Sequence, residues 1–184
     1  MIDRYLKFID ECSSIVPTGF SVGLLIVFCL GAISPWVVAD FKKGIKWSVG
    51  LMLLAYLLWL VSLTVLFRPI LEVRRFDFIP FWSYRAVEAG NGLLLTQIIM
   101  NVVAFIPFGF LLGFSSRKMK WCKVVLIIAG FSLLIETLQF FTRRGFAEFD
   151  DVFHNVVGAM IGYGMFVGLR WLIKRVRRER VVGA

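Results

Sequence analysis

A group of acidic, amide and basic side chains interrupts an otherwise apolar sequence between residues 136 and 155. An ionisable group inside a membrane span is energetically expensive, so Glu136 in its apolar surroundings indicates a functional site. Arginines suit the binding of a phosphate or carboxylate group, whereas carboxylates suit general acid–base catalysis or a divalent cation. The polar residues of this group are Glu136, Gln139, Arg143, Arg144, Asp150, Asp151 and Asn155.

Helical spacing predicts that these residues lie on two helix faces. Gln139 and Arg143 follow Glu136 by three and seven residues, which places the three side chains on one face. The second face carries residues separated by four, three and four positions: Asp151, Asn155, Gly158 and Gly162. Small residues four apart let a neighbouring helix approach closely. We therefore expect the two segments to form a hairpin packed along these faces, with Glu136 paired to Arg143, Arg144 or Arg68.

Two residues outside this region extend the predicted site. Arg68 ends one apolar stretch, and Asn101 lies near the start of another. The aromatic segment 76–84 suits a membrane–water interface, where Trp and Tyr side chains contact both apolar and polar surroundings. Simpler roles compete with a binding function, since Asp150 and Asp151 suit helix N-caps and the amide side chains suit hydrogen bonds between helices.

The composition predicts a lipid environment for most of the chain. Of the 184 residues, 59% are hydrophobic and 16% aromatic, and the mean hydropathy is +0.83, which excludes an ordinary soluble domain. The formal net charge is +9, but the basic residues lie in short segments between apolar stretches, which argues against a nucleic-acid partner. Five stretches are long enough to cross a bilayer: residues 17–39, 48–67, 93–114, 124–141 and 152–169.

The distribution of basic residues predicts the orientation of the spans. Thirteen Lys and Arg residues fall on one side of the predicted bundle and eight on the other. Because the richer side is normally cytoplasmic, we expect the N-terminus outside, the C-terminus in the cytoplasm and the polar residues at the outer leaflet. Asp3, Asp10 and Glu11 precede the first stretch, which favours a retained helix over a cleaved signal.

Five short motifs follow one another along the chain. They are R-P…I-P-F from Arg68 to Phe81, N-x-x-x-F-x-P-F-G from Asn101 to Gly109, E-x-x-Q from Glu136 to Gln139, an arginine shortly before D-D at Asp150, and D-x-x-x-N-x-x-G from Asp151 to Gly158. As an ordered set they resemble the VanZ family of bacterial membrane proteins, over roughly residues 50–170. The resemblance implies a role in the bacterial cell envelope and a link to teicoplanin resistance, but no particular mechanism.

The predicted fold is an all-α, polytopic membrane helix bundle with five transmembrane helices. The resemblance implies a four-helix core, to which the first stretch adds one N-terminal helix. We expect a segment with this extra helix at 1–47, a VanZ-like membrane domain at 48–173 and a basic cytoplasmic tail at 174–184. No cofactor and no metal are expected, because the chain has one His and no metal-ligand motif.

Three functions fit these residues. The first is a non-catalytic protein of the bacterial cell membrane that binds a lipid-linked cell-wall precursor or a teicoplanin-type lipoglycopeptide. Its expected ligand-binding residues are Arg68, Asn101, Glu136, Gln139, Arg143, Arg144, Asp151 and Asn155. The second is a membrane-embedded hydrolase or transferase, with Glu136, Asp150 and Asp151 as a carboxylate site. The third is a lipid transporter, which would require a dimer because no inverted repeat is visible; the sequence leaves the oligomeric state open.

Overall fold

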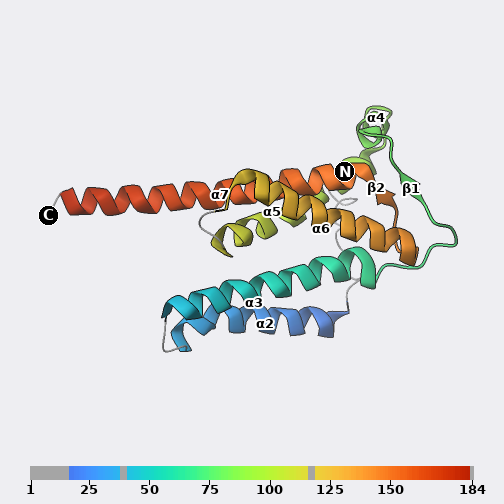
Figure 1. Cartoon of the computed structure of the whole chain (residues 1–184). Helices are drawn as coiled ribbons and strands as arrows, with labels where there is room; N and C mark the ends of the chain where they lie inside the picture. The colour runs from blue at the N-terminus through green and yellow to red at the C-terminus, as the bar shows by residue number, and fades with distance from the viewer. Residues whose placement is uncertain (1–16, 38–40, 116–118, 183–184) are drawn as a thin grey trace.

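The computed structural model describes residues 17–37, 41–115 and 119–182, and it consists almost entirely of helices. In chain order the elements are α2 (Thr18–Val37), α3 (Phe41–Val61), the π-helical segment η1 (Ser62–Leu66), β1 (Phe76–Asp77), α4 (Trp82–Glu88), α5 (Gly92–Ser115), α6 (Trp121–Thr142), β2 (Ala147–Glu148) and α7 (Phe149–Val182). Five of the helices are long and apolar enough to cross a membrane. The predicted all-α class with five transmembrane helices is therefore confirmed (Figure 1).

The helix boundaries differ from the predicted stretches mainly at their basic ends. The apolar span in α3 begins at Lys43 rather than at residue 48. Helix α7 continues to Val182, so most of residues 174–184 extend the last transmembrane helix. Lys and Arg are good helix formers. The backbone therefore stays helical where the sequence has become too polar for hydrocarbon.

Glycines bring α5 and α7 into backbone contact. A Cβ atom at Gly158 would lie 2.0 Å from the carbonyl oxygen of Val102, and one at Gly162 would lie 1.9 Å from that of Ile106. Our expectation that this glycine face packs against the preceding span is wrong, because α5 occupies it. The reason is steric: α5 contributes its own glycine, Gly109, to the contact, so the two backbones fit closely.

A buried apolar core joins four of the helices. Its side chains include Leu60 of α3, Phe105 and Phe108 of α5, Ile128 of α6 and Phe166 of α7. Such contacts stabilise helix association in lipid through van der Waals packing rather than through the exclusion of water. The core therefore holds α3, α5, α6 and α7 in a fixed arrangement around any site between them.

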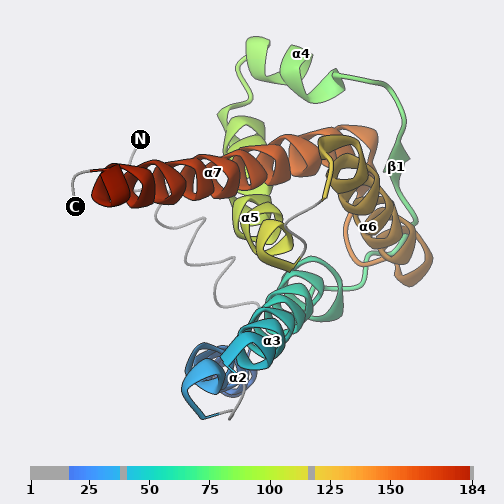
Figure 2. The same ribbon diagram turned by 60° about the vertical axis from the view of Figure 1, so that its left-hand side comes forward.

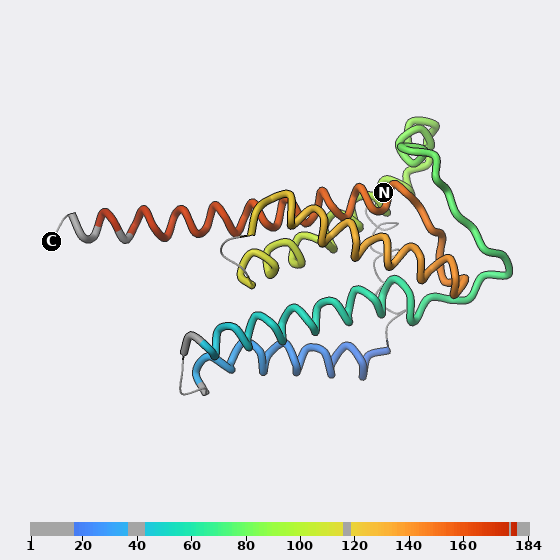
Figure 3. The backbone as a smooth tube through the Cα atoms, in the orientation of Figure 1, coloured from blue at the N-terminus to red at the C-terminus, as the bar shows by residue number. Residues whose placement is uncertain are grey.

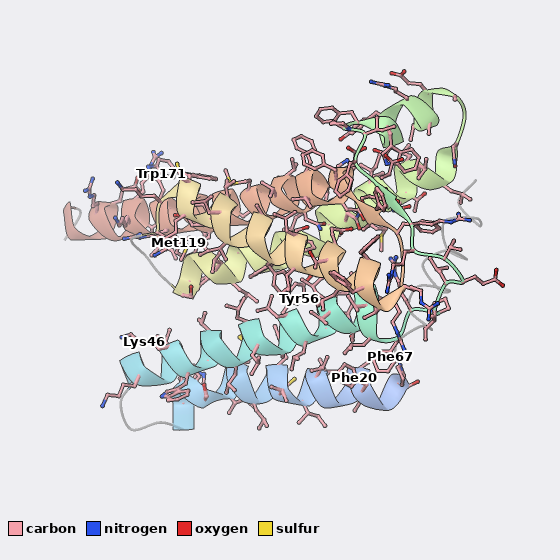
Figure 4. The ribbon with its side chains drawn as sticks, turned by 45° about the vertical axis from the view of Figure 1, so that its right-hand side comes forward. Phe20, Lys46, Tyr56, Phe67, Met119 and Trp171 are labelled. Carbon is pink, nitrogen blue, oxygen red and sulfur yellow. The ribbon has the colours of Figure 1, made fainter. Side chains whose placement is uncertain are left out.

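A hydroxyl from α3 binds the helix α5 one turn before its proline. Pro107 lies inside α5, and a proline removes one backbone donor from a helix. The Tyr56 hydroxyl donates a hydrogen bond to the carbonyl oxygen of Ala104 at 2.5 Å. Figure 4 shows Tyr56 on the side of α3 that faces the other helices. This bond ties α3 to the middle of α5.

Helix α2 lies beside the bundle rather than inside it. It packs along α3, and the two form a hairpin to one side of α5, α6 and α7 (Figure 2). Phe20 of α2 contacts Phe67, just after η1, edge to face at a ring distance of 5.3 Å. Lys46 lies toward the opposite end of the hairpin (Figure 4). The extra N-terminal helix is thus a peripheral element in the described structure.

The polar segments gather at one end of the bundle. Here the chain leaves η1, forms β1 and α4, and returns into α5, as the backbone tube shows (Figure 3). The two short strands pair in parallel at this end, with Phe76 opposite Ala147 and Asp77 opposite Glu148. This pairing joins the segment between η1 and α4 to the connection between α6 and α7.

Candidate functional site

A cavity of about 300 Å³ lies between η1 and the polar ends of α3, α5, α6 and α7. We call it the central cavity. Six of the eight residues predicted to bind a ligand line its wall: Arg68, Asn101, Glu136, Gln139, Asp151 and Asn155. Its remaining wall is largely apolar and includes Tyr56, Trp59 and Phe105. These six residues, four of which helical spacing grouped on two faces, therefore lie around one cavity, and their role in binding stays a prediction.

The amide side chains of the central cavity join the helices and also keep unused acceptors. Asn101 donates from Nδ2 to Asp151 Oδ1 at 2.6 Å, which joins α5 to α7. Gln139 donates to the Thr64 carbonyl oxygen at 3.0 Å, and Asn155 donates to Ser132 Oγ at 2.8 Å. The carbonyl oxygens of both Gln139 and Asn155 are buried without a hydrogen-bond partner. The cavity therefore presents open acceptors in addition to its carboxylates.

Glu136 binds a backbone N–H group instead of an arginine. Its Oε2 atom accepts a hydrogen bond from the Glu148 backbone nitrogen at 2.9 Å. Among the described residues the ion pair within 4 Å joins Arg175 to Glu179, far from this site, so the expected pairing of Glu136 with an arginine is not a direct ion pair. Arg68 does attract the carboxylates of Glu136 and Asp151 electrostatically. The connection between α6 and α7 folds back over Glu136, which explains how a backbone group reaches it first.

The two arginines after α6 lie outside the central cavity. Arg143 adopts a left-handed backbone conformation with φ of 58°, which ends α6, and its side chain is exposed. Helical spacing from Glu136 therefore no longer predicts its direction. Arg144 donates from Nη1 to the carbonyl oxygens of Leu66 and Arg68. It closes the end of η1, where backbone carbonyls would otherwise lack donors.

Asp150 holds the start of α4 in place. Its carboxylate accepts hydrogen bonds from the Phe81 backbone nitrogen at 2.6 Å, the Ser83 backbone nitrogen at 3.1 Å and the Ser83 hydroxyl at 2.5 Å. Phe81 has φ of 60°, a strained conformation for a bulky side chain. The next turn of α7 adds a contact between His154 Nε2 and the Tyr84 hydroxyl at 2.9 Å. Asp150 thus caps α4 across space, and both its oxygens are occupied.

A second, aromatic pocket adjoins the central cavity. It has a volume of about 410 Å³, and five phenylalanines line it: Phe76, Phe78, Phe140, Phe141 and Phe149. Glu136 contributes to the walls of both the aromatic pocket and the central cavity. Glu136 therefore lies between a cavity that contains a cluster of polar side chains and a pocket lined mainly by phenylalanines.

A third pocket contains polar residues that the sequence analysis missed. It measures about 530 Å³, and we call it the arginine pocket after its lining residues Arg74, Arg75, Trp82, Gln97 and Glu148. Burial, and then the neighbouring carboxylate of Asp151, raises the pKa of the Glu148 side chain from 4.5 to about 7. Gln97 lies four residues before Asn101, so helical spacing is the signal that could have placed the two on one face. Arg74 and Arg75 carried no local signal, because only the pairing of β1 with β2 brings them here.

Comparison with known proteins assigns the family. Residues 49–173 match the VanZ/LLP1 family, a range that includes all lining residues of the central cavity and excludes α2. A stretch of 70 residues is 31% identical to the protein VanZ of Enterococcus faecium, and it covers 38% of this chain but only 44% of that relative. No solved structure matches the chain. With a family match over more than half its length and five helices that suit a bilayer, the chain is a multi-pass membrane protein of the VanZ/LLP1 family.

Proposed function

We propose that the protein binds an amphiphilic, lipid-linked or lipidated ligand of the cell envelope. Hydrogen-bond donors of its head group would occupy the central cavity, and its hydrocarbon chain would lie in the aromatic pocket. The observation that carries this proposal is the shared wall at Glu136, where a cavity with a cluster of polar side chains adjoins a pocket lined by phenylalanines. An amphiphile has the same division between its two ends.

The chemistry of the central cavity supports binding rather than a purely structural role. Glu136, Asp151 and the open amide oxygens of Gln139 and Asn155 are acceptors, and Arg68 adds one positive charge. Each unpartnered buried acceptor destabilises a protein by about 1–3 kcal/mol. Hydroxyl or ammonium groups of a ligand would satisfy these acceptors. The carboxylate site of the alternative hydrolase loses one member, because Asp150 is fully engaged by α4.

We place the site at the outer leaflet, in agreement with the excess of basic residues on the opposite side. Cysteine labelling of intact cells tests this orientation. Cys122 is exposed at the start of α6, at the other end of the bundle from the cavity, and we expect an impermeant reagent to leave it unlabelled. Cys12, which we expect to be labelled, lies outside the described residues. Labelling of Cys122 alone would place the cavity at the cytoplasmic leaflet.

Protection against teicoplanin would follow from such binding, because this antibiotic carries a fatty chain and acts at the outer face of the membrane. Expression in a susceptible bacterium should raise tolerance to teicoplanin far more than tolerance to vancomycin, which has no lipid. Glu136→Gln should remove this difference at an unchanged protein level. Glu179→Gln, the same substitution at an exposed residue of α7, is the matched control and should retain it. Equal protection against both antibiotics, or full activity of Glu136→Gln, would contradict the proposal.

A further inference from the structure

Two arginines beside the aromatic pocket have unused hydrogen-bond donors. Arg74 lies over the ring of Phe140 at 5.8 Å, and Arg75 lies over the ring of Phe146 at 5.3 Å. Within the described part of the chain, neither guanidinium forms an ion pair or a side-chain hydrogen bond. Contact with an aromatic face orients a guanidinium group. Its N–H groups stay available for hydrogen bonds. Both side chains are therefore held in position with their donors free.

The arginine pocket adjoins the aromatic pocket. Phe76 and Glu148 line both the arginine pocket and the aromatic pocket. Phe140, which lies beneath Arg74, also lines the aromatic pocket. Two positive charges therefore stand at the rim of a space lined by phenylalanines. This is the arrangement that an anionic head group with an attached hydrocarbon chain requires.

The central cavity is less suited to an anion. Its ionisable groups are two carboxylates, Glu136 and Asp151, against one arginine, Arg68, whereas the arginine pocket has two arginines against the carboxyl groups of Asp77 and Glu148. Its unpartnered atoms are the acceptors of Gln139 and Asn155. An anionic group placed there would meet like charge and acceptors facing acceptors, both of which are unfavourable.

We infer that Arg74 and Arg75 bind the phosphate or carboxylate group of an amphiphile whose chain occupies the aromatic pocket. This inference rests on the proposed function and names the charge of the ligand and the place that holds it. Arg143 and Arg144, which the sequence analysis assigned to this task, do not line the arginine pocket. Trp82 also lines this pocket, and its indole N–H is buried without a hydrogen-bond partner.

Native mass spectrometry of the full chain with two lipids tests the inference. Phosphatidic acid and diacylglycerol with identical acyl chains differ only in the phosphate group. We expect wild-type protein to bind both, and phosphatidic acid about tenfold more tightly, which corresponds to about one charge-assisted hydrogen bond. The double variant Arg74→Gln/Arg75→Gln should lose this preference while retaining diacylglycerol. Both side chains are exposed, so the fold should be unaffected.

The matched control is Arg175→Gln/Arg178→Gln, which removes the same charge from the far end of α7. Arg175 also lies over an aromatic ring, that of Trp171 at 5.5 Å, so the control includes one comparable contact. It should retain the preference for phosphatidic acid. Inorganic phosphate is the second probe, and it should not compete at equal concentration, because it lacks the chain.

The outcomes separate the two proposals. Equal binding of the two lipids by the wild type, or an unchanged preference in the Arg74→Gln/Arg75→Gln variant, would overturn the anion site and leave the amphiphile site intact. Competition by inorganic phosphate would assign the arginines to a free anion and overturn the lipid assignment. Binding of neither lipid by the wild type would overturn both proposals.

Discussion

Asp150 and Asp151 are neighbours in the sequence, yet they belong to two regions of opposite character. In the paired region, which comprises Asp150, Arg144 and the groups that they bind, every charged group is engaged. Asp150 accepts three hydrogen bonds from the start of α4, and Arg144 donates to two backbone carbonyls. The open region is the central cavity, where Asp151 lies and where Gln139 and Asn155 keep buried oxygens without partners.

The comparison shows that residue type alone does not decide the role of a polar group in this protein. A charged side chain that satisfies backbone groups stabilises a loop or a helix end and has little capacity left for a ligand. A polar group with an unfilled bond at a cavity destabilises the free protein and gains most from a ligand. Substitutions in the paired region should therefore change stability, and those in the open region should change binding.

The adjacent aspartates provide the largest expected contrast. Asp150→Asn places an amide N–H against backbone donors of α4 and should lower the free energy of unfolding by about 2–3 kcal/mol. Asp151→Asn keeps an oxygen for the Asn101 amide and should change it by less than about 1 kcal/mol. Reversible unfolding of purified protein in mixed micelles measures both values. Equal destabilisation by the two substitutions would contradict the distinction between the regions.

The two arginines after α6 test the paired region in a second place. Arg144→Ala leaves the carbonyls of Leu66 and Arg68 without their donor, and we expect a loss of about 1–2 kcal/mol. Arg143→Ala removes an exposed side chain from the same connection and should have an effect within about 0.5 kcal/mol. The same unfolding assay compares them. A larger loss for Arg143→Ala than for Arg144→Ala would contradict the assignment of Arg144 to the paired region.

A substitution in the open region should change binding more than stability. Gln139→Met has similar size and removes both the buried unpaired oxygen and the amide donor to the Thr64 carbonyl. Because these two effects oppose each other, we expect the unfolding free energy to change by no more than about 1 kcal/mol. The affinity for teicoplanin should fall about tenfold, as expected for one lost hydrogen bond in a buried site. Titration of the protein in nanodiscs measures this affinity. Thr142→Val, at an exposed hydroxyl of the same helix, is the control and should bind normally.

The smallest effect should appear in the pH dependence of the arginine pocket. Because burial raises the pKa of Glu148 to about 7, its side chain is mostly neutral below that pH and negative above it. A negative Glu148 repels an anionic head group, so phosphatidylglycerol should bind roughly threefold more weakly at about pH 8 than at about pH 6. The charges around Glu148 are those of Asp77, Asp150, Asp151, Glu136, Arg74 and Arg75.

Glu148→Gln makes this pH dependence testable. The substitution keeps the backbone N–H that binds Glu136 and removes only the titrating group. Binding of phosphatidylglycerol, whose own charge is constant over this range, should then be the same at both pH values. An undiminished pH dependence in Glu148→Gln would assign the titration to another carboxylate of the group.

Hydropathy and helical spacing were sufficient to predict five apolar helices and the helix faces that line the central cavity. Hydropathy over a bilayer-length stretch is a local property, and so is the side of a helix on which a residue lies. For this reason Glu136 with Gln139 and Asp151 with Asn155 reached the same cavity as predicted. The sequence also predicted that the polar ends of these helices lie at the same end of the bundle, because alternate connections of antiparallel spans lie on the same side of a membrane.

The hydrogen-bond partners of these groups depend on contacts between segments that lie far apart in the sequence. The left-handed turn at Arg143 ends the helical spacing, so that Arg144 binds η1 and a backbone N–H reaches Glu136. The pairing of β1 with β2 brings Arg74 and Arg75 beside the aromatic pocket, across more than seventy residues of chain. Such contacts depend on the paths of loops and on steric fit between helices, as with the glycine face of α7 and α5. No periodic pattern within one helix encodes them.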